Sequence, residues 1–155
     1  MGEAMSKDST KTLINQILVE LFHDILEIEE QSITTRTNPA ITVNEMHIIE
    51  MIGLNEARSM GEVARGLGIT LPSLTSGINR LVKKGYVERK RMEEDRRVVK
   101  VELTKSGRQI FRAHELFHNQ MVEALIHDLE IEELPLLMNS LEKLRDFFRN
   151  RYFKK

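Results

Sequence analysis

Residues 69–107 read ITLPSLTSGINRLVKKGYVERKRMEEDRRVVKVELTKSG and hold the pattern that decides the fold. Apolar residues recur at helical spacing after Thr70, a good N-cap, and predict a helix that ends at Gly85. Alternating apolar and charged residues then predict two short strands joined by a charged turn at 93–97. This order predicts a winged helix-turn-helix lobe, and so a mainly α chain with a small two-stranded β-wing.

The two faces of the expected helix differ in chemistry. Apolar residues form one face, namely Leu71, Leu74, Ile78, Leu81 and Val82. The other face begins with short hydroxyl and amide groups and continues with long cations, as a helix entering the major groove requires. The candidate DNA contacts here are Thr70, Pro72, Ser73, Thr75, Ser76, Asn79, Arg80 and Lys83. An ordinary surface helix would show the same pattern, so this helix alone leaves both interpretations open.

The charged turn between the strands offers a second candidate contact with DNA. A cationic tip on a thin ribbon can enter the minor groove, where narrow A·T-rich segments concentrate negative potential. The candidate residues are Arg91, Asp95, Arg96 and Arg97. Because Asp95 would repel phosphate, we expect it to orient a neighbouring arginine through a charge-assisted pair.

The formal charge of −1 on this 155-residue chain hides a segregation. Residues 58–108 carry 13 Lys and Arg against 6 Asp and Glu, whereas residues 1–57 carry 3 against 10. A basic segment in an otherwise acidic chain is typical of a nucleic-acid-binding subdomain, although a solvated basic face has the same composition. We expect double-stranded DNA as a partner because the charge and the helix pattern agree.

Composition and motifs exclude several other classes of protein. The chain has no Cys, which rules out thiolate nucleophiles and Cys-ligated zinc. No apolar run approaches the roughly 20 residues that a membrane helix needs, and no signal peptide is present, so we expect a cytoplasmic protein without a membrane partner. Neither a Ser-His-Asp order nor a Gly-rich phosphate loop can be placed. We therefore expect no enzymatic activity and no cofactor.

Helical periodicity continues on both sides of the central stretch. The expected divisions are a flexible N-terminal tail at 1–10, a dimerisation helix at 11–40, the winged DNA-binding lobe at 41–107 and C-terminal dimerisation helices at 108–155. Within the lobe, Thr42 and Glu45 have the spacing of a capping box.

An apolar seam runs along the last expected helix. Its residues, separated alternately by three and four positions, are Leu134, Leu137, Leu141, Leu144 and Phe148. This is the spacing of a narrow coiled-coil contact. A chain of this size has little core left to cover the seam, so we expect the seam and the first helix to pair with a second copy across a two-fold axis.

The motif DRR at 95–97, followed after five residues by LTKSG at 103–107, resembles the wing and the next helix start of the MarR family of bacterial transcription regulators. LVKKGYVER at 81–89 resembles the end of that family's recognition helix, and the flanking helices match over residues 11–153. The resemblance implies that Arg96 and Arg97 probe the minor groove. It also implies that Ser73, Ser76 and Arg80 lie at the major groove.

A shorter motif concerns regulation. EMHIIEMIG at 45–53 resembles a segment of the fatty-acid-biosynthesis repressors within this family. That resemblance implies a repressor whose corepressor is a long acyl chain carried on acyl carrier protein. Two alternatives stay open: an aromatic or phenolic inducer that releases the repressor, and a metal-responsive regulator. His114 and His118, four positions apart, would share a helix face for a metal, but the sequence identifies no third ligand.

A small apolar ligand would need a cavity, and methionine-rich apolar helices can supply one. The candidate lining consists of Phe22, Ile25, Leu26, Met46, His47, Ile49, Phe117 and Met121. Core packing explains these residues equally well. The sequence leaves the operator, the regulated genes and the effector open.

Overall fold

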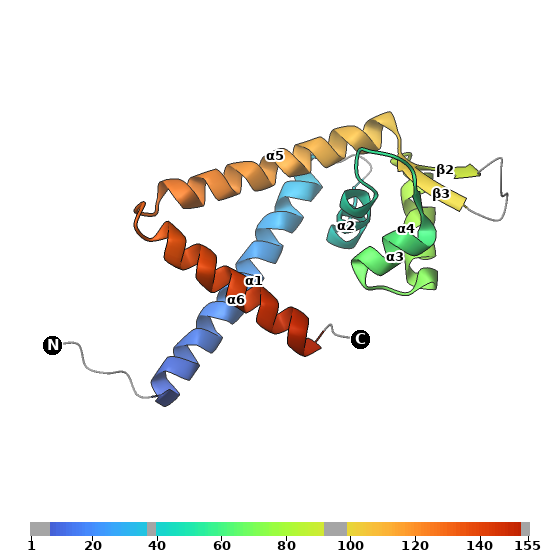
Figure 1. Ribbon diagram of the computed structural model, residues 1–155. Helices are drawn as coiled ribbons and strands as arrows, with labels where there is room; N and C mark the ends of the chain where they lie inside the picture. The colour runs from blue at the N-terminus through green and yellow to red at the C-terminus, as the bar shows by residue number, and fades with distance from the viewer. Residues whose placement is uncertain (1–6, 37–39, 92–98, 153–155) are drawn as a thin grey trace. The chain divides into compact units, whose positions relative to one another are not determined.

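The computed structural model describes residues 7–36, 40–91 and 99–152 (Figure 1). Its elements are α1 (Lys7–Arg36), α2 (Val43–Ile52), β1 (Arg58–Ser59), α3 (Met60–Leu67), α4 (Leu71–Lys83), β2 (Val87–Arg91), β3 (Val99–Leu103), α5 (Lys105–His127) and α6 (Leu134–Tyr152). The chain divides into two compact units, Met1–His114 and Glu115–Lys155. The first unit holds the winged elements, and the described part of the chain is mainly helical, which confirms the predicted fold class.

The short helices of the first unit begin at hydroxyl residues, as the sequence predicts. Thr42 caps α2 and Ser59 caps α3, each in a capping box with a glutamate three residues later. Thr70 caps α4, where its side chain accepts a hydrogen bond from the Ser73 amide. Gly68, with φ +66°, forms the left-handed turn between α3 and α4. These local signals fix the two helix starts of the helix-turn-helix.

The sheet has the antiparallel strand order β1-β3-β2. Val87 pairs with Leu103 and Arg91 with Val99, which is the hairpin that alternation predicts. The short strand β1 pairs Arg58 with Val101 on the other edge of β3. The two-stranded wing is thus confirmed, and β1 adds a third strand that the sequence did not indicate, because a two-residue strand is too short to show any alternation.

The core of the first unit lies among α2, α3, α4 and the sheet (Figure 1). Its fully buried side chains include Met46, Ile49, Ile52, Val63, Leu74, Ile78, Leu81 and Val101. Helices α2 and α4 approach closely, since a Cβ added at Gly77 would meet Ile48 Cδ1 at 2.4 Å. This packing fixes α4 against α2.

Two residues of the predicted apolar face of α4 are exposed. Leu71 is 50% exposed and Val82 is 36% exposed. Leu71 lies in the first turn beside the exposed cap, and Val82 lies one helical step away from buried Leu81. The buried arc of α4 is thus narrower than the periodicity suggests.

Helices α1 and α6 contrast with this core. In α1, Phe22 is 70% exposed and Ile17 is 50% exposed, whereas Ile33 near its end is buried. Helix α6, in the second unit, has no buried residue. Within the described ranges, none of the helices combines the length and the apolar character needed to cross a membrane.

Candidate nucleic-acid interface

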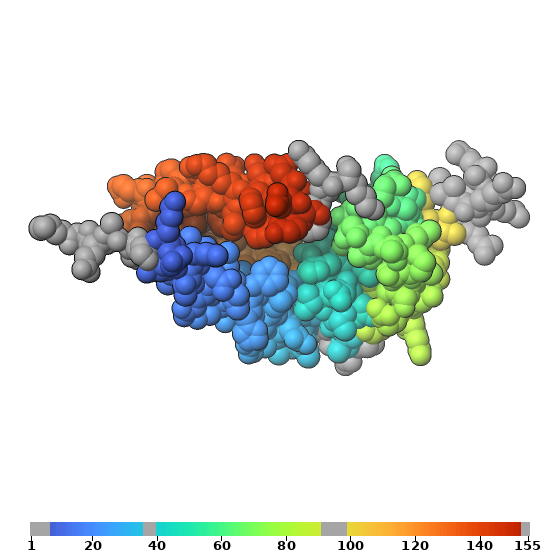
Figure 2. Space-filling model, turned by 90° about the horizontal axis from the view of Figure 1, so that it is seen from below, coloured from blue at the N-terminus to red at the C-terminus, as the bar shows by residue number. Residues whose placement is uncertain are grey.

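Helix α4 lies at the surface of the first unit, next to the strands (Figure 2), and one side of this helix is polar. The exposed residues of this face are Pro72, Ser73, Ser76, Asn79, Arg80 and Lys83, and Thr75 is half-buried. Buried Leu74, Ile78 and Leu81 anchor the opposite side. The face expected to meet DNA is therefore accessible.

Hydroxyl groups organise the first turns of α4. Thr70 Oγ1 accepts from the Ser73 amide and donates to Ser73 Oγ at 2.9 Å. Thr75 Oγ1 donates to the carbonyl oxygen of Leu71 at 2.8 Å. Pro72 stands in the first turn, where no backbone donor is required. Both threonine hydroxyl groups therefore donate their hydrogen bond within the helix. Towards an incoming DNA group, each can act only as a hydrogen-bond acceptor.

Arg80 connects the polar face of α4 to helix α2. Its Nε donates to Glu45 Oε1 at 3.0 Å, and its Nη1 donates to Ser76 Oγ at 3.0 Å. Glu45 Oε2 accepts from Lys84 Nζ at 2.7 Å and from the Thr42 amide at 2.9 Å. The Glu45 side chain is only 1% exposed, whereas that of Arg80 is 54% exposed.

The environment of Glu45 stabilises its charged form. Burial by itself raises the pKa of the carboxyl. Hydrogen bonds from Lys84, the Thr42 amide and Arg80 act in the opposite direction and prevail, so the pKa lies below its ordinary value. Sequence reasoning treated Glu45 only as a capping residue. The capping box was the sole local signal, because its cationic partners lie 35 and 39 residues away.

The wing strand β2 is tied to the same helix. Arg89 Nη2 donates to Asn79 Oδ1 at 2.5 Å, which joins the polar face of α4 to the hairpin. Lys90 pairs with Glu102 across β2 and β3. Asp95, Arg96 and Arg97 lie outside the described residues, as does the side chain of Arg91. The structure thus shows where the helix residues of the predicted DNA surface lie, while their contact with DNA, like that of the wing tip, stays a prediction.

The candidate ligand-pocket residues occupy different environments. Met46 and Ile49 are fully buried in the core. Phe22, Ile25 and Leu26 are 70%, 41% and 44% exposed on α1. Phe117 and Met121 are half-buried in the second unit. For Met46 and Ile49, the core-packing alternative is therefore sufficient.

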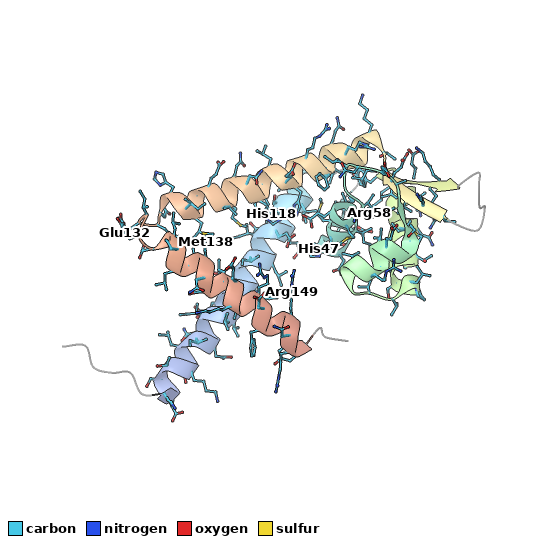
Figure 3. All side chains as sticks on the ribbon, viewed as in Figure 1. His47, Arg58, His118, Glu132, Met138 and Arg149 are labelled. Atoms are coloured by element: carbon cyan, nitrogen blue, oxygen red, sulfur yellow. The ribbon has the colours of Figure 1, made fainter. Side chains whose placement is uncertain are left out.

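A polar cluster joins α1, α2 and the first half of α5 within the first unit, and its member His47 is labelled in Figure 3. Glu29 Oε1 lies 3.4 Å from His47 Nε2 and 3.5 Å from His114 Nε2. The same His114 nitrogen lies 3.3 Å from Glu50 Oε1. Glu29 and His114 are buried. Sequence spacing could not identify Glu29 as a neighbour of His114, because 85 positions separate them.

The predicted seam on α6 is accessible in the single chain. Leu141, Leu144 and Phe148 are 52%, 36% and 41% exposed. Leu134 and Leu137 are half-buried. Exposed apolar side chains at this spacing leave a surface that a second helix could cover.

Known proteins resemble this chain in sequence and in structure. Residues 41–98 match the family model described as MarR family. Streptococcus pneumoniae FabT, in a crystal structure with DNA, is 38% identical with a TM-score of 0.86, over 90% of this chain and 98% of that chain. The HTH-type transcriptional regulator PchR of Bacillus subtilis (strain 168) is 25% identical over 153 residues, 88% of each chain. Wild-type MarR from E. coli in its apo form is 28% identical with a TM-score of 0.59, over 82% of this chain and 96% of that chain.

These matches agree with the fold, the capped helix-turn-helix and the basic helix face described above. The chain belongs to the MarR family of winged helix-turn-helix transcriptional regulators, as its wing motif predicts, and it is a regulator rather than an enzyme.

Proposed function

We propose that the protein is a homodimeric transcriptional repressor that reads a pseudo-palindromic operator with one α4 helix in each half-site. The observation that carries the proposal is the exposed face of α4, where hydroxyl groups at the start are followed by Asn79, Arg80 and Lys83. The 38% identity to FabT, whose crystal structure contains DNA, supports DNA binding by this chain. Recognition helices of a dimer enter successive major grooves about 34 to 36 Å apart, so half-sites should be about one helical turn apart.

The homodimer is supported by the two exposed apolar helices. Helix α6 has no buried residue, and Leu141 alone is 52% exposed. Helix α1 likewise exposes Phe22 and Ile17. A second copy that covers both helices would remove these apolar groups from water. Light scattering at micromolar concentration should give the mass of a dimer, and a monomer would refute this assembly.

For the effector, we propose a long acyl chain carried on acyl carrier protein, acting as corepressor. The proposal is supported by the likeness to FabT and by the segment at 45–53 that resembles the fatty-acid-biosynthesis repressors. An effector changes operator affinity only through its different affinities for the DNA-binding and the other conformations. A corepressor must therefore bind the DNA-bound conformation more tightly.

The test measures operator affinity with and without acyl carrier protein that bears a long acyl chain. Tighter binding with the acyl form, and no change with the unacylated carrier, is the expected result. Weaker binding would instead favour the alternative, an inducer such as an aromatic or phenolic compound. No effect of the acylated carrier would remove the acyl corepressor.

A second candidate, a metal-responsive regulator, is favoured by the polar cluster around Glu29. A buried carboxylate with imidazole nitrogens at 3.4 and 3.5 Å is a donor set suited to zinc. In the structure these groups contact one another directly, and such contacts explain the cluster without a metal. If the candidate holds, zinc should change operator affinity, and both a chelator and Glu29→Gln should abolish that change.

A further inference from the structure

We propose that Glu45 is a positioning residue for DNA recognition, which holds the Arg80 guanidinium in the orientation that reads the operator. The inference rests on the proposed function, because it requires α4 to enter DNA. Glu45 itself lies in α2 and is 1% exposed, so it acts through Arg80 rather than by touching DNA.

The Arg80 guanidinium is held at two points of its plane. Nε donates to Glu45 Oε1, and Nη1 donates to Ser76 Oγ, each at 3.0 Å. Because the guanidinium is rigid and planar, two such bonds fix the direction of its other N–H groups. The side chain is nevertheless 54% exposed, so the held group remains accessible to a base edge or a phosphate.

Glu45 is suited to hold another residue because it is itself held. Its Oε2 accepts from the Thr42 amide in the capping box of α2 and from Lys84 Nζ. Helix α2 is in turn fixed against α4, where Gly77 leaves no room beside Ile48 for a Cβ. The carboxylate therefore joins the start of α2 to the end of α4 as part of the packed core rather than as a mobile surface pair.

Glu45 is expected to affect DNA affinity in two opposite ways: its charge weakens binding, whereas its hold on Arg80 strengthens binding to the operator. A carboxylate in the DNA-binding unit repels phosphate, so its neutralisation alone should tighten binding to every DNA sequence. Loss of the Arg80 orientation should weaken binding only where Arg80 makes a defined contact. The difference between selected and unselected DNA therefore distinguishes the two effects.

The test uses the full-length protein and two duplexes of equal length and composition. One is selected by the wild-type protein from a random-sequence library, and the other is a shuffled version of it. Anisotropy measures the dissociation constant of each over a range of salt concentrations. Glu45→Gln keeps a capping-box side chain and should lose about tenfold in affinity for the selected duplex, the order of one bidentate base contact. Affinity for the shuffled duplex should stay unchanged or rise.

Two comparisons show whether the effect passes through Arg80. In an Arg80→Ala background, Glu45→Gln should cause no further loss on the selected duplex, and an additive loss would overturn the proposal. Glu56→Gln removes one exposed carboxylate from the same unit, with Glu56 away from Arg80 in the α2–β1 loop, and should leave the preference intact. Equal tightening on both duplexes by Glu45→Gln would also overturn the proposal.

Thermal melting separates loss of positioning from loss of fold. If Glu45→Gln does not fold, Arg80→Lys decides, because lysine keeps the exposed charge but lacks the rigid planar fork that Glu45 and Ser76 orient. This variant should lose the preference for the selected duplex, and a retained preference would overturn the proposal. If the wild-type protein selects no sequence at all, the proposed DNA recognition fails first.

Discussion

The winged part of the first unit and helix α6 differ in how they bury their apolar residues. Met46, Ile49 and Leu81 are fully buried within one chain. Helix α6 carries as regular an apolar pattern, yet none of its residues is buried. The winged part thus forms its core from one copy, whereas in the proposed homodimer α6 buries its apolar residues against a partner. Periodicity alone does not distinguish a helix that packs within its chain from one that packs between chains.

The largest effect is expected from salt and concerns the basic side of the winged part. A protein with about 6 to 10 phosphate contacts loses on the order of 10³ to 10⁵ in affinity between about 50 and 200 mM salt. We expect a loss in this range on operator DNA, measured by anisotropy. Dimerisation through apolar α6 should change little over the same range, since it needs few ion pairs. Operator binding that is independent of salt would contradict recognition through phosphate contacts, and no operator binding at all would favour a winged unit that binds a protein.

The next-largest effects are expected when one apolar side chain is shortened to alanine in each of the two regions. Ile49→Ala should lower the free energy of unfolding by about 2 to 5 kcal/mol, because it opens a cavity in a fully packed core. Urea unfolding monitored by circular dichroism measures this loss, which should be similar at every protein concentration.

The matched change on α6 is Leu141→Ala, at a side chain that is 52% exposed in one chain. If α6 pairs with a second copy, this variant should shift the protein toward monomer on dilution, and its stability should depend on concentration. Sedimentation at several concentrations checks the shift. A loss at Leu141 that does not vary with concentration would contradict the contrast between the two regions.

The wing tip gives a smaller effect. Arg97→Ala should cost about 1 to 3 kcal/mol on the specific site, the size of a typical lost contact in an operator. The affinity of the same variant for shuffled DNA should fall less, because on that DNA the arginine reads only the local shape of the minor groove. A negligible change on the operator would mean that this arginine does not enter the groove.

Sequence reasoning succeeded where the determinant is local. The caps at Thr42 and Thr70 and the β-hairpin depend on residues that lie close together in the chain, so the sequence alone predicts them. Contacts over long separations were missed, namely Glu45 with Arg80 and Glu29 with His114. In both cases a glutamate on a polar helix edge looks solvated until the fold brings a cation or an imidazole to it.

The smallest expected effect is a change of stability with pH, and it concerns Glu45 in the winged part of the first unit. Its pKa is lowered in the folded protein, so its charged form adds stability above the ordinary value of 4.5. That contribution should disappear as the pH falls from about 4.5 through the lowered pKa, when the carboxyl takes up a proton and releases Arg80 and Lys84. The wild-type free energy of unfolding should therefore fall more steeply below this pH than that of Glu45→Gln.

Urea unfolding from pH 7 to pH 3, at one fixed protein concentration, measures this difference. The other carboxyl groups titrate in both proteins, so their contributions largely cancel when the two curves are subtracted. The remaining difference should be constant above about pH 5 and should shrink below it. A constant difference throughout would mean that the pKa of Glu45 is not lowered in the folded protein, and that its hydrogen bonds to Thr42, Lys84 and Arg80 add no net stability to its charged form.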